Sequence, residues 1–251
     1  MLFRWSIWGE KKQNLEMLLY SISSFRIYFG NSARYVVYTD EPSEVSNRLG
    51  CTTEVYSYNT HSSRCFDISS IATWRKWCPV VRLVPGKTEF YVDSDIFIVG
   101  QPNEILGFCA GVSGNRFMTM QESIAARWCF GRFDSRVSIC SPPINAGLIG
   151  QQPQADLTFN LLNEFRWWQE NITPEEATFH DEQGAVVAAL FPYITEGLVD
   201  LLSTERYRIV SPRSNSDLNE LSNVALIHTT YPDHPGFHKF RTLLDMHNKN
   251  L

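Results

Sequence analysis

The sequence has no long hydrophobic run. Its longest apolar stretch, residues 185–191, has seven residues, whereas a membrane-spanning helix needs about 20. Arg4 and the charged residues 10–12 interrupt the apolar N-terminal run, so no signal peptide is predicted. We therefore expect a soluble, cytoplasmic protein without a transmembrane segment, and leave open whether it associates peripherally with a membrane.

Closely spaced cysteine pairs are also missing. The six cysteines form no C-x-x-C pair and show no spacing typical of zinc ligands. Because the sequence carries no export signal, reduced and mostly buried thiols are expected in place of disulfides.

Positive charge is scarce. Lys and Arg number 22 against 27 Asp and Glu, which gives a formal net charge of −5. A general nucleic-acid binder carries a basic footprint, so no nucleic-acid partner is expected. A polyanionic ligand would have to be held by a few local cations or by a metal ion.

What the sequence does contain is apolar and aromatic residues. The hydrophobic share of 43% excludes a disordered chain. Aromatic residues make up 13% of the 251 positions. They favour an aromatic core, and contacts to sugar rings are the alternative, since C–H faces of sugars pack on aromatic rings.

Strand-like and helical segments alternate from the first residues onward. An apolar run at 2–8, a helical period at 14–28 and a β-branched run at 34–39 predict a β-α-β unit. Without an internal repeat or linker, this order predicts one α/β domain with a Rossmann-like, mostly parallel central sheet flanked by helices. Further strands are expected at 52–56, 89–92, 96–99, 144–149, 206–210 and 224–227, and further helices at 68–83, 157–168, 183–190 and 237–247. Pro79 must kink the helix at 68–83 or end its first part. Residues 101–143 show no period.

Two carboxylates follow a nearly apolar strand directly. Asp93 and Asp95 come after residues 89–92, and His228 ends the apolar run 224–227 in the same way. Ligands of such sheets bind at the carboxyl ends of strands. Carboxylate oxygens suit Mg²⁺ or Mn²⁺, and an added imidazole favours Mn²⁺. A polar loop with Asp caps and a structural histidine are the alternatives.

Zinc is not expected at the C-terminal histidines. His228, His234 and His238 cannot share one helix face because Pro235 and Gly236 separate the last two, and no Cys stands at finger spacing.

Four sequence blocks together carry a family resemblance. In order and spacing they resemble the metal-dependent nucleotide-sugar glycosyltransferases of the GT-A fold with a DxD motif, above all the clan of glycogenin and the bacterial lipopolysaccharide galactosyl- and glucosyltransferases. The resemblance implies a single GT-A-like domain over residues 1–251. Its nucleotide-binding part would span about residues 1–100, and its acceptor-binding and completing part about residues 101–251. The blocks are 90–95 (FYVDSD) with Gly100, 144–149 (INAGLI), 181–183 (DEQ), and His228 with Lys239.

The resemblance implies residues that bind the donor diphosphate. Asp93, Asp95 and His228 would bind Mn²⁺, or Mg²⁺, on the diphosphate of a UDP-sugar, with Ser94 beside them. Lys239 would reach the diphosphate, although the segment after His228 departs from the family pattern and makes His234 a competitor.

The nucleotide and the donor sugar have further candidates. Ile7, Trp8 and Gly9 would hold the base, and Asp40 ends a strand at the same edge of the sheet. Lys76 would contact the donor, with Arg75 as the alternative. Trp74 and Trp77 around them favour one buried helix face.

The transferred sugar would meet Asn145 and residues 181–183 in this resemblance. Asp181, Glu182 and Gln183 would contact its hydroxyls and flank the anomeric carbon. A tight turn at Asn145 and a helix cap at Asp181 are the structural alternatives. No acidic pair stands where inverting relatives place a general base, which favours retention, while Asp181 or Glu182 as an inverting base stays open.

These expectations describe a hexosyltransferase of polysaccharide biosynthesis that uses a glycan or another hydroxyl acceptor. Acceptor contacts would come from residues 101–143, where Arg127, Trp128 and Asp134 are candidates. A non-catalytic sugar-nucleotide binder of the same fold is one alternative. A DxD phosphohydrolase is another, although such enzymes place a Thr or Val where this chain has Phe97.

Overall fold

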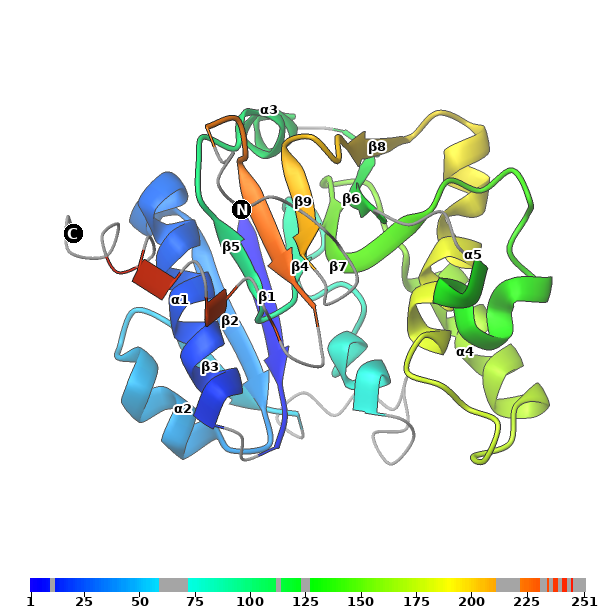
Figure 1. The fold of residues 1–251 in the computed structure, drawn as a ribbon, viewed down its shortest axis with the longest axis horizontal. Helices are drawn as coiled ribbons and strands as arrows, with labels where there is room; N and C mark the ends of the chain where they lie inside the picture. Colours follow the sequence, from blue (N-terminus) through cyan, green and yellow to red (C-terminus); the bar gives the residue numbers. More distant parts are fainter. Residues whose placement is uncertain are drawn as a thin grey trace.

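The computed structural model describes most of the chain. The described residues are 1–9, 12–58, 72–111, 114–122, 127–210, 222–230, 234, 237–238, 241–242 and 245. They form an α/β domain in which helices cover both faces of a central sheet (Figure 1).

The strands are short and mostly buried. They are β1 (Leu2–Ile7), β2 (Arg34–Thr39), β3 (Glu54–Ser57), β4 (Glu89–Val92), β5 (Ile96–Ile98), β6 (Phe117–Gln121), β7 (Ile144–Gln151), β8 (Val199–Leu202), β9 (Tyr207–Val210) and β10 (Leu226–Thr229).

The α-helices are α1 (Lys12–Phe29), α2 (Pro42–Leu49), α3 (Asn103–Ala110), α4 (Thr158–Asn171) and α5 (Asp181–Thr195). The described residues also contain three 3₁₀ segments, η1 (Gly30–Ser32), η2 (Ala72–Trp77) and η3 (Arg127–Ser135). None of the described helices is long and apolar enough to cross a membrane.

The central sheet has seven strands in the order β3-β2-β1-β4-β7-β6-β8. Its first four strands are mutually parallel. β7 runs antiparallel to both of its neighbours, and β8 is parallel to β6. The predicted mostly parallel α/β sheet is therefore confirmed. Because β7 runs against β4, its first residues lie beside the residues that follow β4.

A second sheet of three strands, β5-β10-β9, stands beside the first. β10 pairs antiparallel with β5, so that His228 lies opposite Ile96. This pairing carries a histidine from the end of the chain to the residues that directly follow Asp95.

The strands divide their side chains between two apolar clusters, as a period of two requires. Phe3, Trp5 and Ile7 of β1 point toward α1, α2 and α3. Leu2 of β1 and Tyr91 of β4 point to the other face, toward η2, η3, α4 and α5.

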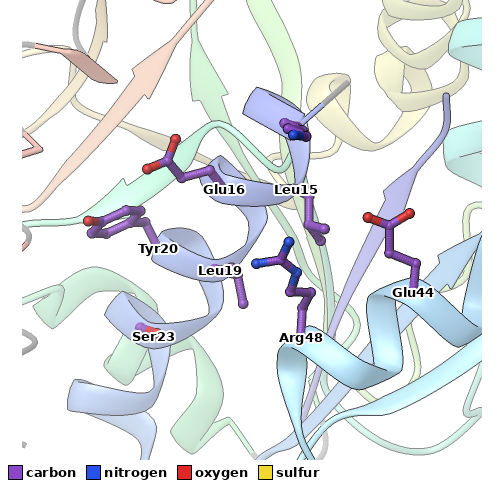
Figure 2. Close-up of a pocket in the computed structure, with 8 residues that line it drawn as sticks. Leu15, Glu16, Leu19, Tyr20, Ser23, Glu44 and Arg48 are labelled. Carbon is purple, nitrogen blue, oxygen red and sulfur yellow. The ribbon is translucent and has the colours of Figure 1, made fainter. Parts of the chain in front are cut away.

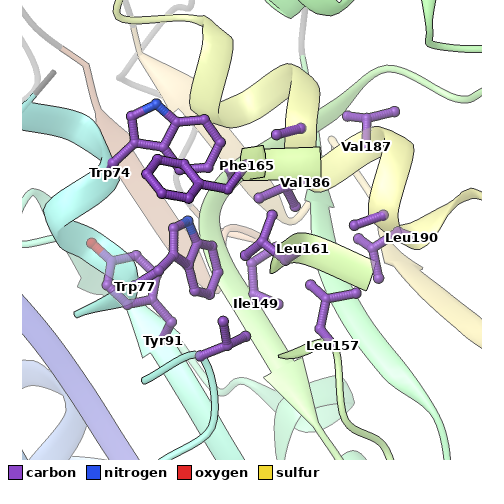
Figure 3. Packing of buried hydrophobic residues seen from close by; sticks show 14 of the residues in the cluster. Trp74, Trp77, Tyr91, Ile149, Leu157, Leu161, Phe165, Val186, Val187 and Leu190 are labelled. Atoms are coloured by element: carbon purple, nitrogen blue, oxygen red, sulfur yellow. The ribbon is translucent and has the colours of Figure 1, made fainter. Parts of the chain in front are cut away.

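In the cluster packed against η2, η3, α4 and α5, aromatic rings pack among aliphatic side chains (Figure 3). Trp74 packs 4.7 Å from Phe165, and Trp77 packs 5.2 Å from Tyr91, both measured between ring centroids. Trp74 and Trp77 are both buried. The aromatic residues therefore serve the core here, as expected for these two tryptophans.

Most predicted elements are confirmed within a few residues. Of the helix expected at 68–83, residues 72–77 form a 3₁₀ turn that ends before Pro79, as one of the two alternatives predicted, and residues 78–83 are not helical. The part of it before Ala72 lies outside the described residues. Residues 101–143, which had no assignment, contain α3, β6 and η3, and α2 and β8 were also missed. The described residues of 237–247 are helical, as expected.

The five described cysteines carry free thiols, but only two of them are buried, so the expectation of mostly buried thiols is wrong for these residues. Cys78 and Cys129 are buried and Cys109 is half-buried, while Cys51 and Cys140 are exposed. Cys65 lies outside the described residues.

Candidate active site

The two sheets bring Asp93, Asp95 and His228 together. Asp93 follows β4, and its N–H donates a 2.7 Å hydrogen bond to the carbonyl of Gly147 in β7. Nε2 of His228 lies 3.2 Å from Oδ1 of Asp95 and 3.9 Å from Oδ2 of Asp93. One ligand atom from each of the three residues lies within 4.8 Å of the others.

Gly147 makes room for the imidazole of His228. A Cβ on Gly147 would lie 2.5 Å from Cε1 of His228, closer than any side chain allows. The glycine of the predicted INAGLI block is therefore required by a close approach between β7 and β10.

The donor set fits a divalent cation. Two carboxylates and one imidazole, partly or fully buried, are ligands for Mn²⁺ and, less specifically, for Mg²⁺. Burial alone would raise the pKa of Asp95, but His228 and His234 beside it hold that pKa below its usual range. Burial lowers the pKa of His228, and Asp95 more than offsets this and raises it. The carboxylate is thus held ionised, as a metal ligand must be.

Lys76 lies on the other side of Asp93. Its Nζ is 3.0 Å from Oδ2 of Asp93 and 3.3 Å from Oε2 of Glu182. Burial would lower the pKa of Lys76, but these carboxylates raise it above its ordinary value. A permanently charged ammonium therefore stands beside the candidate metal ligands.

Arg75 points elsewhere. Its guanidinium is 3.6 Å from Oδ2 of Asp40, which also accepts a 3.2 Å hydrogen bond from the N–H of Gly9. Successive residues of a 3₁₀ turn point about 120° apart, so neighbouring cations reach different partners. Lys76, and not Arg75, faces Asp93.

The residues expected at the base surround the end of β1. Ile7 is buried, Trp8 is half-buried, and Gly9 has φ +79°, a left-handed conformation that favours glycine. The hydroxyl of Tyr58 donates a 3.0 Å hydrogen bond to the carbonyl of Ile7. These contacts place the three residues at the sheet edge where Asp40 also lies.

Glu182 and Tyr91 complete the buried polar network. The indole N–H of Trp77 donates a 2.7 Å hydrogen bond to Oε1 of Glu182, and burial raises the pKa of that carboxyl. The hydroxyl of Tyr91 donates a 2.6 Å hydrogen bond to Oδ1 of Asp93. No sequence pattern pointed to a role for Tyr91, because its position in an apolar strand predicted a core residue.

Gln183, next to Glu182 in α5, and Asn145, in β7, are both held by hydrogen bonds. The Gln183 amide accepts from the N–H of Ala146 (3.3 Å) and donates to the carbonyl of Cys129 (3.1 Å). Asn145 donates a 3.0 Å hydrogen bond to Oε2 of Glu122. Glu122 was missed, because it lies in the segment without a period, directly after β6.

Asp181 is fully buried and engages protein groups. Its carboxylate accepts hydrogen bonds from the Trp168 indole (2.9 Å), from the N–H (2.9 Å) and hydroxyl (2.6 Å) of Thr178, and from the N–H of Arg132 (2.8 Å). These bonds tie η3 and the residues before α5 to the start of that helix. None of them comes from an N–H of the first turn of α5, so Asp181 does not cap the helix through its side chain.

Ser94 lies in the turn between the two aspartates. Lys239 lies outside the described residues. Arg127 and Asp134 form an ion pair of 2.5 Å with each other, and Trp128 beside them is exposed.

Two hollows lie along α1. The larger, of about 470 Å³, lies between α1 and α2 and is lined by residues such as Leu15, Leu19 and Arg48 (Figure 2). The smaller, of about 30 Å³, touches Ile7 and Gly9. Asp93, Asp95 and His228 line neither of them, so the site is defined by its side-chain cluster.

Comparison by sequence finds no matching family model and no matching curated protein. Comparison of structures finds glycosyltransferases. The galactosyltransferase LgtC, crystallised with donor and acceptor sugar analogs, superposes with a TM-score of 0.57 at 12% identity, over 98% of this chain and 96% of its own.

Two further glycosyltransferase structures also superpose on this chain. The bifunctional glycosyltransferase WbbM gives a TM-score of 0.63 at 13% identity, over all of this chain and 50% of its own length. Mouse xyloside xylosyltransferase 1 gives 0.53 at 12% identity, over 90% of this chain and 96% of its own. The chain thus has the fold of the GT-A glycosyltransferases that its sequence resembles.

Proposed function

We propose that this chain is a metal-dependent glycosyltransferase that moves a hexose from a UDP-sugar to a glycan or another hydroxyl acceptor. The observation that carries the proposal is the convergence of Asp93, Asp95 and His228 beside the buried ammonium of Lys76. A divalent cation at these ligands, together with Lys76, would supply the local positive charge that a diphosphate requires and that an acidic chain lacks overall. Within the fold, residues 1–100 would hold the nucleotide and residues 101–251 would serve the acceptor.

In this proposal Asp93, Asp95 and His228 hold the divalent cation, Mn²⁺ or Mg²⁺. The cation supplies Lewis-acid stabilisation of the diphosphate as the sugar leaves. Lys76 orients Asp93 and adds fixed charge at the same place, and Ser94 and Lys239 complete the diphosphate contacts.

The nucleotide lies at the ends of β1 and β2 in this proposal. Ile7, Trp8 and Gly9 contact the base, and Asp40 borders the same place through its bond from Gly9. Arg75, paired with Asp40, limits where the nucleotide reaches.

The donor sugar lies against Glu182, Gln183 and Asn145. Gln183 bridges β7 and η3, so its amide is held in place close to the candidate cation site. The bond from the anomeric carbon to the diphosphate breaks, and the acceptor oxygen bonds to that carbon.

The hydrogen bonds that occupy the carboxylate of Asp181 favour retention. Its carboxylate accepts four hydrogen bonds from protein donors, which leaves it poorly suited to act as a general base. The leaving diphosphate then accepts the proton of the acceptor hydroxyl. Glu182, held by Trp77 and Lys76, is likewise engaged on both oxygens.

The acceptor is proposed to bind near η3. Trp128 and Phe179 are 49% and 58% exposed, and the ring of His180 contacts both of their rings. The backbone carbonyl of Cys129, next to Trp128, accepts a hydrogen bond from the side chain of Gln183. This bond links the exposed aromatic surface to the proposed sugar site. A cytoplasmic role in polysaccharide biosynthesis is part of the proposal.

A thermal-shift screen of nucleoside diphosphates and UDP-sugars, with and without Mn²⁺, tests the donor assignment. We expect stabilisation by UDP ligands that requires the cation, its loss in Asp95→Asn and its retention in Asp200→Asn, a control on the exposed Arg116–Asp200 ion pair. Metal-dependent UDP binding without turnover of any UDP-sugar would instead support the non-catalytic binder. Phosphate release from an aryl phosphate without UDP binding would contradict the proposal.

A further inference from the structure

A second imidazole, that of His234, contacts Asp95. Its Nδ1 is 3.2 Å from Oδ2 of Asp95, while Nε2 of His228 is 3.2 Å from Oδ1. Each carboxylate oxygen therefore meets one histidine. His234 is 8% exposed, so this contact is shielded from water.

The contacts of His234 reveal where its proton lies. Nδ1 is also 2.7 Å from the carbonyl oxygen of Thr229. A carbonyl oxygen only accepts hydrogen bonds, so Nδ1 carries the proton. The N–H is shared between Thr229 and Asp95, and this nitrogen has no lone pair for a cation. His234 differs from His228 in its partners: Nδ1 of His234 is tied to a backbone carbonyl, whereas Nε2 of His228 faces the two carboxylates of the candidate ligand set.

The backbone holds His234 in this place. Its φ is +42°, in the left-handed region that few residues other than glycine adopt. Its N–H donates to the carbonyl of Thr230 (3.2 Å), and its carbonyl accepts from the N–H of the buried Phe237 (2.9 Å). Such conformations persist where the surroundings determine them, and they cluster at functional sites.

The main chain of Asp95 is held in place as well as its side chain. The N–H of Thr229 donates a 2.9 Å hydrogen bond to the carbonyl of Asp95. Thr229, at the end of β10, thus holds the backbone of Asp95, and His234, five residues later, holds its side chain.

We propose that His234 is a positioning residue that fixes one oxygen of Asp95, so that the other oxygen faces His228 and the bound divalent cation. This inference rests on the proposed metal site. A carboxylate that already points to the cation loses less freedom on binding, and hydrogen-bond partners of metal ligands commonly set affinity in this way.

Two substitutions separate the side chain from the backbone. His234→Asn keeps an N–H donor near the position of Nδ1, and Asn tolerates the left-handed conformation. His234→Gly tolerates that conformation and removes the donor. The Mn²⁺ dissociation constant is measured on the full chain without substrate, from the electron paramagnetic resonance signal of free Mn²⁺.

We expect His234→Gly to bind Mn²⁺ about 10- to 100-fold more weakly. His234→Asn should stay close to the unchanged chain. His234→Ser, whose side chain is too short to reach Asp95, should match His234→Gly and replaces it if the glycine variant does not fold.

Equal Mn²⁺ affinity in the glycine variant and the unchanged chain would overturn this inference and leave the metal site standing. Equal losses in the Asn and Gly variants would also overturn it, because the imidazole itself would then be required. An unchanged chain that binds no Mn²⁺ would overturn both this inference and the proposed metal site.

Discussion

The indole N–H of Trp77 donates a 2.7 Å hydrogen bond to Oε1 of Glu182, although the two residues are 105 positions apart. Both side chains are buried, and the other oxygen of Glu182 faces Lys76. The core tryptophan thus sets the orientation of a carboxylate in the candidate active site.

Replacing Trp77 by Phe should therefore affect both stability and donor use. The buried carboxylate loses its donor, which should cost about 1–3 kcal/mol in the free energy of unfolding. The KM for the UDP-sugar should rise as well. Trp74→Phe, in the same 3₁₀ turn and the same core, is the control and should lower stability without changing the KM. Equal effects of the two variants on the KM would contradict this role of Trp77.

Lys76 and Glu182 form a buried ion pair. Removing only the lysine should destabilise the protein more than removing the charges of both partners. Lys76→Met should lower the free energy of unfolding by about 3–5 kcal/mol, because it strands a buried carboxylate. Adding Glu182→Gln should recover part of that loss, as urea unfolding of the single and double variants would show. Arg75→Met, which removes a more exposed cation, should cost less than about 1 kcal/mol. A double variant as destabilised as the sum of the single ones would contradict the pairing.

Gly147 should tolerate no side chain. In Gly147→Ala the new Cβ would lie 2.5 Å from His228, so overpacking should cost about 1–3 kcal/mol and displace the imidazole. Calorimetric titration should show weaker Mn²⁺ binding. Gly107→Ala, in α3 with nothing within 4 Å of its added Cβ, should instead stabilise by about 0.5–1 kcal/mol. Unaltered Mn²⁺ affinity in Gly147→Ala would contradict the described packing of β7 against His228.

The cysteines should differ in their reactivity toward alkylating reagents, according to the burial and the pKa of each thiol. Burial raises the pKa of Cys109 to about 12 and that of Cys129 to about 11, so their reactive thiolate is rarer at pH 8 than in an ordinary cysteine. Iodoacetamide at pH 8 should label Cys51 and Cys140, mapped by mass spectrometry, and spare Cys78, Cys109 and Cys129 until the chain is denatured. Raising the pH toward 11 should begin to label Cys129 before Cys109. Fast labelling of Cys109 at pH 8 would contradict the burial and the raised pKa described for its thiol.

The sequence was sufficient where the signal was local. Apolar strand residues followed at once by Asp93 and Asp95 predict both β4 and the acidic pair at its end. His228 was predicted beside them because its own apolar run ends in the same way. Parallel strands place the ends of β2 and β4 at one edge of the central sheet. His228 instead ends β10 of the second sheet and reaches the acidic pair through the antiparallel pairing of β10 with β5, which the sequence pattern did not predict.

The rest depended on three-dimensional contacts. Sequence left Arg75 and Lys76 as alternatives, since only the rotation of the 3₁₀ turn decides which cation meets Asp93. Asp181 and Glu182 were likewise equivalent, although successive helix residues face different directions and only Glu182 faces Lys76. Glu122 was missed because its segment has no hydrophobic period.

The most direct test of the account is UDP release from a UDP-sugar by the unchanged chain and by Asp95→Asn, measured with and without Mn²⁺. The account predicts release that depends on Mn²⁺, falls to background in Asp95→Asn and is rescued by no other divalent ion. Release by Asp95→Asn at the rate of the unchanged chain, or release unaffected by a chelator, would contradict it.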